Sequence, residues 1–331
     1  MNGKQLIAVL AFLMIVFFSF TGCAYDQGEL IGVISETPTL KAFLTSTSTK
    51  SPTPQKTNTP VKSNPSLGEV EPTLSEKTTE ILPTKDPHSI KITIIFDNYP
   101  FDDTLSTGWG FAALVENRGY SILFDTGGLG DVFMENLHTL KIDPKGIDAV
   151  MISNMHGDHI AGLLPFLEES NEPTVYLLPS FSSAFKKKVS SNSQVVEVAQ
   201  SQEIFAGIYS TGGLSAVGVS EQALVVDRGD DIVVITGCAH PGVVNIVRKA
   251  KSVVQLNMNE GTKPVALVLG GFHLMDASRT EIKGIIEDLQ ALGVQRVSPT
   301  HCTGDGAIAM FREHFGEGYI PAGVGKIITL P

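Results

Sequence analysis

Short apolar runs separated by glycine-rich turns fill the chain from Ser89 to its last residue. Apolar runs of about four to eight residues are typical of strands, whereas apolar residues spaced three and four apart are typical of helices. The spacing predicts helices over 131–140, 160–167, 241–247 and 278–292, with Asp131 capping the first. The runs predict strands over 91–96, 111–115, 121–124, 147–152, 174–178, 195–198, 222–226, 231–235, 265–269 and 294–297. We therefore expect a mixed α/β (α+β) domain over residues 89–331.

The first 22 residues have the pattern of a signal peptide. Lys4 is the only charge before an apolar run over residues 6–20, which is short for a membrane span of about 20 residues and ends in small residues. The end of this segment, Phe20-Thr21-Gly22-Cys23, resembles a bacterial lipoprotein signal. The resemblance implies that Cys23 becomes a lipidated N-terminus, which anchors the exported protein at the extracytoplasmic face of the membrane. The alternative is a secretory signal with an incidental cysteine.

Residues 23–88 are predicted to be an unstructured tether. The stretch from 35 to 88 is rich in Thr and Ser, holds eight of the 18 prolines and contains one aromatic residue, Phe43. Such a composition buries too little apolar surface to offset the entropy lost on ordering. The tether would hold the domain clear of the lipid.

The net charge of −11 narrows the range of partners. Nucleic acids and anionic membrane surfaces bind clustered basic residues, and the one basic run, 186–188, is expected on a solvated helix face. We therefore expect a small-molecule substrate, no nucleic acid, and contact with the membrane through the lipid on Cys23. The two other cysteines, Cys238 and Cys302, are too few for a disulfide framework.

Most histidines of the chain directly follow predicted strands. Five of the eight do so: His156, His159, His240, His273 and His301. Side chains at the ends of separate strands can converge at one edge of packed sheets, so this placement predicts a common site. The loop after 147–152 also carries Asp158, which makes two imidazoles and a carboxylate within four residues.

Each of these residues also has a structural interpretation. A single histidine at a strand end is more often a satisfied polar residue than a ligand, and Cys302 is expected to be a small buried packing residue. The group of His156, Asp158 and His159 is different, because gathering such side chains without a cation is costly. Imidazole, thiolate and carboxylate are the ligands that zinc prefers.

The ordered motifs of the chain resemble those of the metallo-β-lactamase superfamily. These motifs are Asp125-Thr126-Gly127, Asn154-x-His156-x-Asp158-His159-x-x-Gly162, Thr236-Gly237-Cys238-Ala239-His240 and Pro299-Thr300-His301. The runs Gly-Cys-Ala-His-Pro-Gly, Gly-Gly-Phe-His-Leu and Thr-His-Cys-Thr-Gly resemble the branch of metal-dependent hydrolases that includes the archaeal dihydropterin ribofuranosylaminobenzene 5′-phosphate synthase. The resemblance implies an αββα metallo-β-lactamase-like sandwich from about residue 90 onward, with metals at one edge of its sheets.

The resemblance also implies a set of metal ligands. In the superfamily the central turn reads His-x-His-x-Asp-His, where the first two histidines serve one metal and the Asp-His pair serves the other. Asn154 stands at the first position here, and a neutral amide is a poorer zinc ligand than imidazole, so we expect a weakened first site. Asp158, His159 and His301 would form the second site, and His156 would remain in the first.

Other positions leave more than one role open. Cys238 stands where much of the superfamily has an aspartate that bridges the metals, and either Cys238 or His240 could be the ligand, with His240 favoured. His273 is a metal ligand or a substrate contact. Asp125 is expected to orient a ligand histidine. Gly108-Trp109-Gly110 replaces a Glu-His-Gly run that is usual in the branch, which should alter the substrate pocket.

The resulting hypothesis is a zinc-dependent hydrolase on the cell surface that cleaves an ester, phosphoester or lactone-like small molecule. One or two zinc ions would activate a bound water as hydroxide, and Asp158 would hold the metal and receive the proton. Manganese and iron remain alternatives to zinc. The rival hypothesis is a surface-anchored protein that binds a metal or ligand but has lost turnover because of Asn154. A di-iron oxidoreductase is disfavoured, because such relatives usually carry a flavin domain.

Overall fold

The computed structural model describes residues 86, 88–216, 218–255 and 262–331. The predicted signal peptide, Cys23 and nearly all of the predicted tether lie outside these residues, so they stay predictions. No helix among the described residues is long and apolar enough to cross a membrane.

The first of two large sheets is built mostly from the N-terminal half of the domain. Within the described residues it has seven strands in the order β15-β1-β2-β3-β4-β5-β6. Its strands β1, β3 and β4 run in the same direction, because β2 is antiparallel to both β1 and β3 and β3 is parallel to β4. The strands are β1 (Ile90–Phe96), β2 (Ala112–Asn117), β3 (Tyr120–Phe124), β4 (Ala149–Met151), β5 (Thr174–Leu177), β6 (Gln194–Glu197) and β15 (Ile327–Leu330).

The second large sheet comes mostly from the C-terminal half. It has six strands within the described residues, in the order β14-β13-β12-β11-β8-β7, and β12, β13 and β14 are parallel. These strands are β7 (Gln202–Phe205), β8 (Ile208–Ser210), β11 (Leu224–Asp227), β12 (Ile232–Thr236), β13 (Val265–Gly271) and β14 (Val297–Thr300). A separate hairpin joins β9 (Leu214–Ala216) to β10 (Val219–Glu221).

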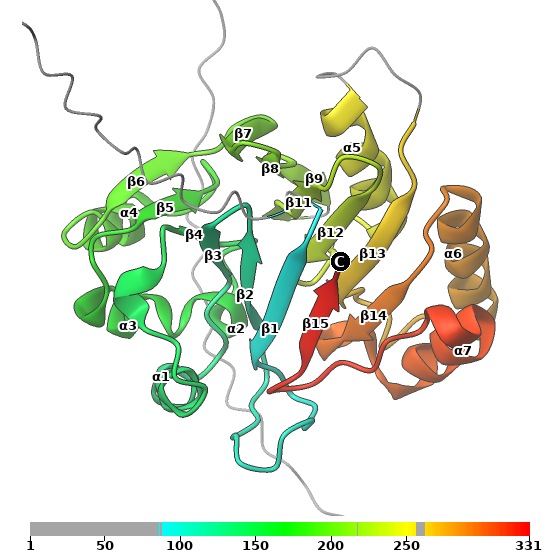
Figure 1. Ribbon diagram of the computed structural model, residues 1–331, viewed down its shortest axis with the longest axis horizontal. Helices are drawn as coiled ribbons and strands as arrows, with labels where there is room; N and C mark the ends of the chain where they lie inside the picture. Colours follow the sequence, from blue (N-terminus) through cyan, green and yellow to red (C-terminus); the bar gives the residue numbers. More distant parts are fainter. Residues whose placement is uncertain (1–85, 87, 217, 256–261) are drawn as a thin grey trace, which may run out of the picture. The chain divides into compact units, whose positions relative to one another are not determined.

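Helices cover the outer face of each sheet (Figure 1). Those on the first sheet are α1 (Gly130–Thr139), α3 (Leu163–Glu169) and α4 (Ser183–Val189), and those on the second are α5 (Val243–Gln255), α6 (Arg279–Ala291) and α7 (Asp305–Phe315). Three apolar cores separate these layers: one between the sheets, and one between each sheet and its helices. Burial of apolar side chains in all three cores stabilises the arrangement. The αββα sandwich expected from the sequence is confirmed.

Some predicted elements were wrong in detail. The last predicted strand, 294–297, is shifted, because Val294 forms only an isolated bridge and the strand runs over Val297–Thr300. Asp131 does not cap α1, since the N-cap is Leu129 and no side chain accepts a hydrogen bond there. The four short strands over 202–221 and β15 were not predicted.

The strand directions bring several loops to one edge of the sandwich. The carboxyl ends of β1, β3 and β4 lie at one edge of the first sheet, and those of β12, β13 and β14 share one edge of the second. Each of these strands is followed within a few residues by a polar or metal-ligating side chain. Functional side chains are therefore expected at the edge where these strands end.

Candidate metal centre

The loop after β4 shapes the first part of the candidate site. The buried amide of Asn154 forms hydrogen bonds within this loop. Its Nδ2 donates to Ser153 Oγ at 3.0 Å, and its Oδ1 accepts a hydrogen bond from the backbone N–H of His156 at 3.0 Å. Asp158 and His159 then lie in the single turn of α2 (Gly157–Ile160). The backbone N–H of Phe111 donates to the carbonyl of Asp158 at 3.3 Å and ties the loop to the segment before β2.

Four side chains from three loops form a buried group, which we call the closed group: Asp158, His159, Cys238 and His301. His159 and His301 are fully buried, and Cys238 is nearly so. His159 Nε2 lies 3.1 Å from Cys238 Sγ and 3.8 Å from Asp158 Oδ2. His301 Nε2 lies 3.4 Å from the same sulfur and 3.3 Å from the same carboxylate oxygen.

The imidazole of His159 is fixed by Asp125, which follows β3. His159 Nδ1 donates to Asp125 Oδ2 at 2.7 Å. Ser153 holds the carboxylate in turn, through its backbone N–H at 2.6 Å and its hydroxyl at 2.7 Å. A carboxylate on Nδ1 sets the tautomer of a ligand histidine, so that Nε2 carries the free lone pair. The orienting role predicted for Asp125 agrees with this geometry.

Asn98, just after β1, plays the corresponding part for His301. Its Oδ1 accepts from His301 Nδ1 at 3.0 Å, and its Nδ2 donates to the His301 carbonyl at 3.3 Å. Both Asp125 (φ 58°) and His301 (φ 51°) have the left-handed backbone that non-glycine residues rarely adopt. Such strain persists where surrounding contacts hold it, and it is common at functional sites.

A second group, which we call the open group, lies beside the first. It consists of Cys238, His240 and His273, so the sulfur of Cys238 belongs to both groups. His240 is half-buried and His273 is exposed. The rings of His240 and His273 have centroids 4.6 Å apart, and His156 meets His240 edge-on at 4.8 Å.

Glu221 holds the turn that carries two members of the open group, Cys238 and His240. This fully buried carboxylate accepts the backbone N–H groups of Cys238 at 2.9 Å, Ala239 at 2.8 Å and His240 at 2.8 Å. It also accepts from His240 Nδ1 at 2.8 Å, which leaves His240 Nε2 free. Four hydrogen bonds to one carboxylate fix the turn on which Cys238 and His240 are carried.

Electrostatics favour the ionised forms of Asp158 and Glu221. Burial works to raise the pKa of Asp158, but the hydrogen bond with His301 and the charges of His159 and His301 lower it well below its usual range. Burial of Glu221 is likewise outweighed by its hydrogen bonds from His240 and the backbone, which lower its pKa. In the metal-free protein, burial would lower the pKa of His159, yet the negative charge of Asp125 raises it to about 9. The centre therefore attracts positive charge.

The closed group fits a tetrahedral cation. Ligands about 2.0–2.3 Å from zinc stand about 3.3–3.8 Å from one another. The four separations between Nε2, sulfur and carboxylate oxygen given above, 3.1 to 3.8 Å, span this range closely. The donor set of two imidazoles, one sulfur and one carboxylate suits zinc and related ions better than magnesium or calcium.

The structure thus brings together most residues singled out in the sequence. Asp158, His159 and His301 share one group as expected, and His156 lies outside both groups but against His240. Cys238 belongs to both groups and His240 to the open group, so either can still be a ligand. Cys302 is buried beside it, with its Sγ 3.5 Å from the Cys238 carbonyl oxygen.

Two orienting residues escaped the sequence analysis. Asn98 follows β1 directly after Asp97, so the rule that polar residues at strand ends gather at one edge would have found it. Glu221 sits at the end of β10 in a stretch where no strand was predicted. Its buried carboxylate has no local signal in the sequence.

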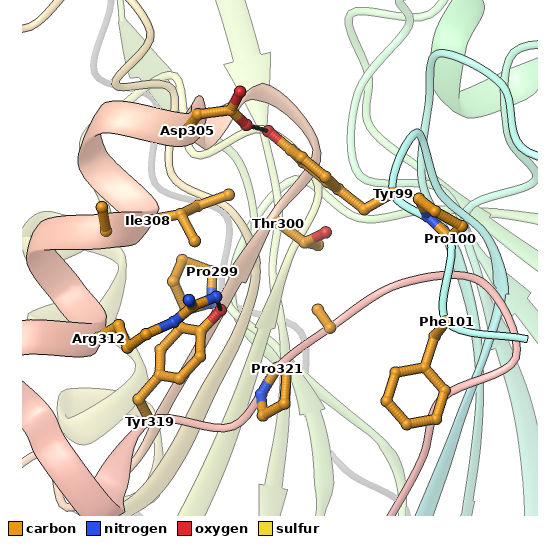
Figure 2. Close-up of a pocket in the computed structure, with 12 residues that line it drawn as sticks. Tyr99, Pro100, Phe101, Pro299, Thr300, Asp305, Ile308, Arg312, Tyr319 and Pro321 are labelled. Atoms are coloured by element: carbon orange, nitrogen blue, oxygen red, sulfur yellow. Dashed lines mark hydrogen bonds between the residues drawn. The ribbon is translucent and has the colours of Figure 1, made fainter.

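Among the cavities that the described residues line near the ends of β13 and β14, two are compared with the candidate metal centre. The larger, about 430 Å³, is shown in Figure 2, and no member of either group lines it. Its polar groups pair with each other: Tyr99 OH donates to Asp305 at 2.8 Å, and Arg312 lies over the Tyr319 ring at 5.0 Å. The smaller cavity, about 380 Å³, is lined by His273 and Cys302, and therefore opens onto the candidate metal centre.

Comparison with known proteins identifies the family. The sequence model described as Metallo-beta-lactamase superfamily matches residues 109–301, more than half of the chain. The chain therefore belongs to the metallo-β-lactamase superfamily. Membership implies the use of a divalent metal, for which the two groups offer candidate ligands.

Individual relatives place the chain within this superfamily. It is similar to 7,8-dihydropterin-6-methyl-4-(beta-D-ribofuranosyl)-aminobenzene-5'-phosphate synthase of Methanocaldococcus jannaschii, with 28% identity over 67% of this chain and 89% of the relative. It is also similar to the crystal structure of Tm1679, a metal-dependent hydrolase of the β-lactamase superfamily, with 28% identity, a TM-score of 0.59, and coverage of 72% and 98% of the two chains. The Bacillus subtilis protein YhfI shares the fold at 16% identity, with a TM-score of 0.52 and coverage of 73% and 99%. The resemblance to this superfamily predicted from the motifs is confirmed.

Proposed function

We propose that the protein is a zinc-dependent hydrolase that cleaves an ester, phosphoester or lactone-like small molecule. The observation that carries this proposal is the closed group, in which two imidazoles, a carboxylate and a sulfur converge and Nδ1 of both imidazoles is already hydrogen-bonded. Preorganised ligands of this kind cost little to arrange around a cation. One of the relatives is named a synthase and another a metal-dependent hydrolase; for this chain we propose hydrolysis.

The residues of the site divide the work of hydrolysis between them. Asp158, His159, Cys238 and His301 would hold the cation, and the open group, with His156 beside His240, would hold a second one more weakly. A bound cation supplies an activated water and polarises the oxygen under attack. Asp158 is the one ionised member of the closed group that also reaches solvent, with 19% of its side chain exposed, so it is positioned to receive a proton.

A thiolate at Cys238 favours zinc over harder ions. The hydrogen bond with Cys302 and burial raise the pKa of the Cys238 thiol, so the sulfur is protonated until a cation displaces the proton. Metal uptake should therefore release protons and weaken at low pH. Thiolate and imidazole ligands select zinc, or iron, rather than magnesium.

Metal analysis combined with a substrate panel tests the proposed function. The purified chain should contain zinc and hydrolyse at least one generic carboxylic ester, lactone or phosphodiester, and His301→Ala should lose metal and activity together. His138→Ala is a matched control, because His138 is an exposed histidine of α1 that pairs with Glu169. Activity of the His301→Ala protein without metal would refute the proposal.

The rival function is metal or ligand binding without turnover, and Asn154 motivates it. The amide is hydrogen-bonded at both ends within its loop, which leaves the open group one imidazole short of the superfamily pattern. Asn154→His separates the two functions. Hydrolysis and uptake of a second metal that appear only in this variant would favour the binding protein, whereas an active parent protein favours the enzyme.

We also propose display on the outer face of a bacterial membrane through lipid on Cys23. The proposal rests on the sequence of residues 1–23, which lie outside the described part of the chain. Expressed in a bacterium, the full chain should take up labelled fatty acid and sediment with membranes, and Cys23→Ser should abolish the label. A labelled Cys23→Ser protein would contradict the lipid site.

A further inference from the structure

Trp109 is the only tryptophan of the chain, and it stands exposed beside the metal centre. About half of its surface, 48%, is exposed, yet its ring centroid lies 4.8 Å from the imidazole of His301. A large aromatic ring left open to solvent next to a ligand histidine is available to contact a bound molecule. Trp109 also lines the 380 Å³ cavity that reaches His273 and Cys302.

The segment that carries Trp109 is held firmly in place. The backbone N–H of Phe111 donates to the Asp158 carbonyl at 3.3 Å, and the N–H of Gly127 donates to the Phe111 carbonyl at 3.1 Å. Gly110 has φ 144°, and a side chain there would overlap the Asp158 carbonyl and the backbone of Gly128. The indole is therefore presented from a backbone pinned to the loop that supplies Asp158 and His159.

Two methionines, one in the lining of the cavity and one in the loop after β4, are also exposed. Met275 is 59% exposed and lines the cavity with Trp109. Met155, 47% exposed, lies in the loop between Asn154 and His156. Exposed apolar side chains that gather at the mouth of a site indicate contact with an apolar part of a ligand.

Two carboxylates line the cavity, and no Lys or Arg among the described residues lines it with them. The carboxylates are those of Asp276 and Glu281, neither of which forms an ion pair with another described residue. The net charge of the chain is also negative. An anionic group beside Asp276 and Glu281 would meet two carboxylates without a Lys or Arg, whereas a cationic group there would meet these carboxylates and could contact the indole.

We propose that the cavity beside the metal centre binds a substrate with an aromatic ring and a positive charge, such as a quaternary ammonium or protonated amine. The ring lies against Trp109 and Met275, the charge faces Asp276 and Glu281, and the bond to be cleaved points to His273 and the two ligand groups. The catalytic part of this assignment rests on the proposed function, whereas the binding part does not. A volume of about 380 Å³ suits a small ring-bearing molecule of this kind.

The fluorescence of the single tryptophan tests the binding directly, without turnover. The zinc-supplemented full chain would be titrated with benzyltrimethylammonium, benzyl alcohol, benzenesulfonate and tetramethylammonium, and quenching of tryptophan emission would give each dissociation constant. Benzenesulfonate is chosen because sulfonates are poor metal ligands, so that its binding reports the charge of the cavity. We expect benzyltrimethylammonium to bind about tenfold tighter than benzyl alcohol and tetramethylammonium, and benzenesulfonate to bind most weakly.

Variants separate the ring from the charge. The double variant Asp276→Asn/Glu281→Gln should remove the tenfold preference for the cation and leave benzyl alcohol unchanged. The matched control is Glu287→Gln/Asp288→Asn, which removes two exposed carboxylates of α6 that pair with Lys283 and Arg248. This control should keep the preference.

Calorimetry on Trp109→Ala completes the test. This variant should lose binding of both ring compounds about tenfold, and Trp109→Phe should restore most of it. Benzenesulfonate that binds as tightly as the cation, or a preference that survives in Asp276→Asn/Glu281→Gln, would overturn the proposal. Because quenching does not need hydrolysis, cation binding by a protein that cleaves nothing would refute the proposed enzyme and keep this site.

Discussion

The closed group and the open group share one sulfur but differ in how firmly they are built. In the closed group both imidazoles are fully buried, and each has its Nδ1 held by a side chain from another loop, Asp125 or Asn98. In the open group Glu221 holds Nδ1 of His240, whereas His273 is exposed. Rigid, desolvated ligands favour affinity, whereas accessible ones leave room for water and substrate.

The difference indicates a division of labour at the edge of the sandwich. Four protein ligands in the closed group are typical of a tightly held cation, while hydrolysis needs a coordination position that substrate or water can reach. In the proposed hydrolase, the open group and the cavity lined by His273 would provide that access. Asn154, tied up inside its loop, removes one imidazole from the open side without disturbing the closed one.

Removing one histidine from each group should have the largest effect and should separate the two groups most clearly. His159→Ala should lose all tightly bound metal and bring hydrolysis to the background rate, because it removes the imidazole that Asp125 holds in place in the closed group. His240→Ala should keep one metal per chain and lose about 10- to 100-fold in activity. Metal analysis after exhaustive dialysis, with rates on the same samples, checks both. Equal metal loss in the two variants would remove the distinction between the groups.

The orienting carboxylates sharpen the comparison at the next level. Asp125→Asn and Glu221→Gln keep the size of each side chain but remove the negative charge that lies beside His159 or His240. We expect each to weaken metal binding about 10- to 100-fold, Asp125→Asn at the tighter site and Glu221→Gln at the weaker one. Competition with a chelating dye measures both affinities. The comparison would fail if Asp125→Asn affected the weaker site alone.

Asp97, a buried carboxyl that interacts electrostatically with His301, should affect the stability of the fold rather than metal affinity. Burial raises the pKa of Asp97 to about 6 from 3.8, against hydrogen bonds from Thr300 and Tyr99 that lower it. The folded protein then binds more protons than the unfolded chain between these pH values, so stability is full below pH 3.8 and falls as pH rises through about 6. The expected loss is about 3 kcal/mol at most.

The variant Asp97→Asn isolates this titration. It should remove the loss between pH 4 and 6, since Asn can accept from the backbone N–H of Tyr99 and the Thr300 hydroxyl can reverse its hydrogen bond. The free energy of unfolding by urea, measured for both proteins across this range, gives the difference. Parallel pH profiles would show that the pKa of Asp97 is the same in the folded protein as in the unfolded chain.

The sequence predicted the parts of this centre that local patterns mark. Apolar runs followed by histidine located the ends of β12, β13 and β14. The loop after β4 was recognised because it carries two histidines and an aspartate within four residues. The order of motifs also predicted the sandwich. What joins these loops is long-range: Glu221 reaches Cys238 and His240 from a short hairpin of mixed polarity, and Asn98 reaches His301 across about two hundred residues of chain. No local periodicity encodes such contacts.

The surroundings of Trp109 are a second example of long-range contacts that the sequence does not encode locally. The sequence marked the run Gly108-Trp109-Gly110 as a departure that should alter the substrate pocket. Only the fold shows that the ring rests against His301 and lines a cavity with Asp276 and Glu281.

A cobalt titration of the metal-free protein tests the central claim, that one rigid group with a thiolate ligand holds the first cation. Cobalt(II) takes up zinc sites and reports a coordinated thiolate by a charge-transfer band in the near ultraviolet. The first equivalent should bring this band to its full height in the parent and in Cys302→Ser, and produce none in Cys238→Ser. A first equivalent bound without the band in the parent, or with the same band in Cys238→Ser, would contradict the account.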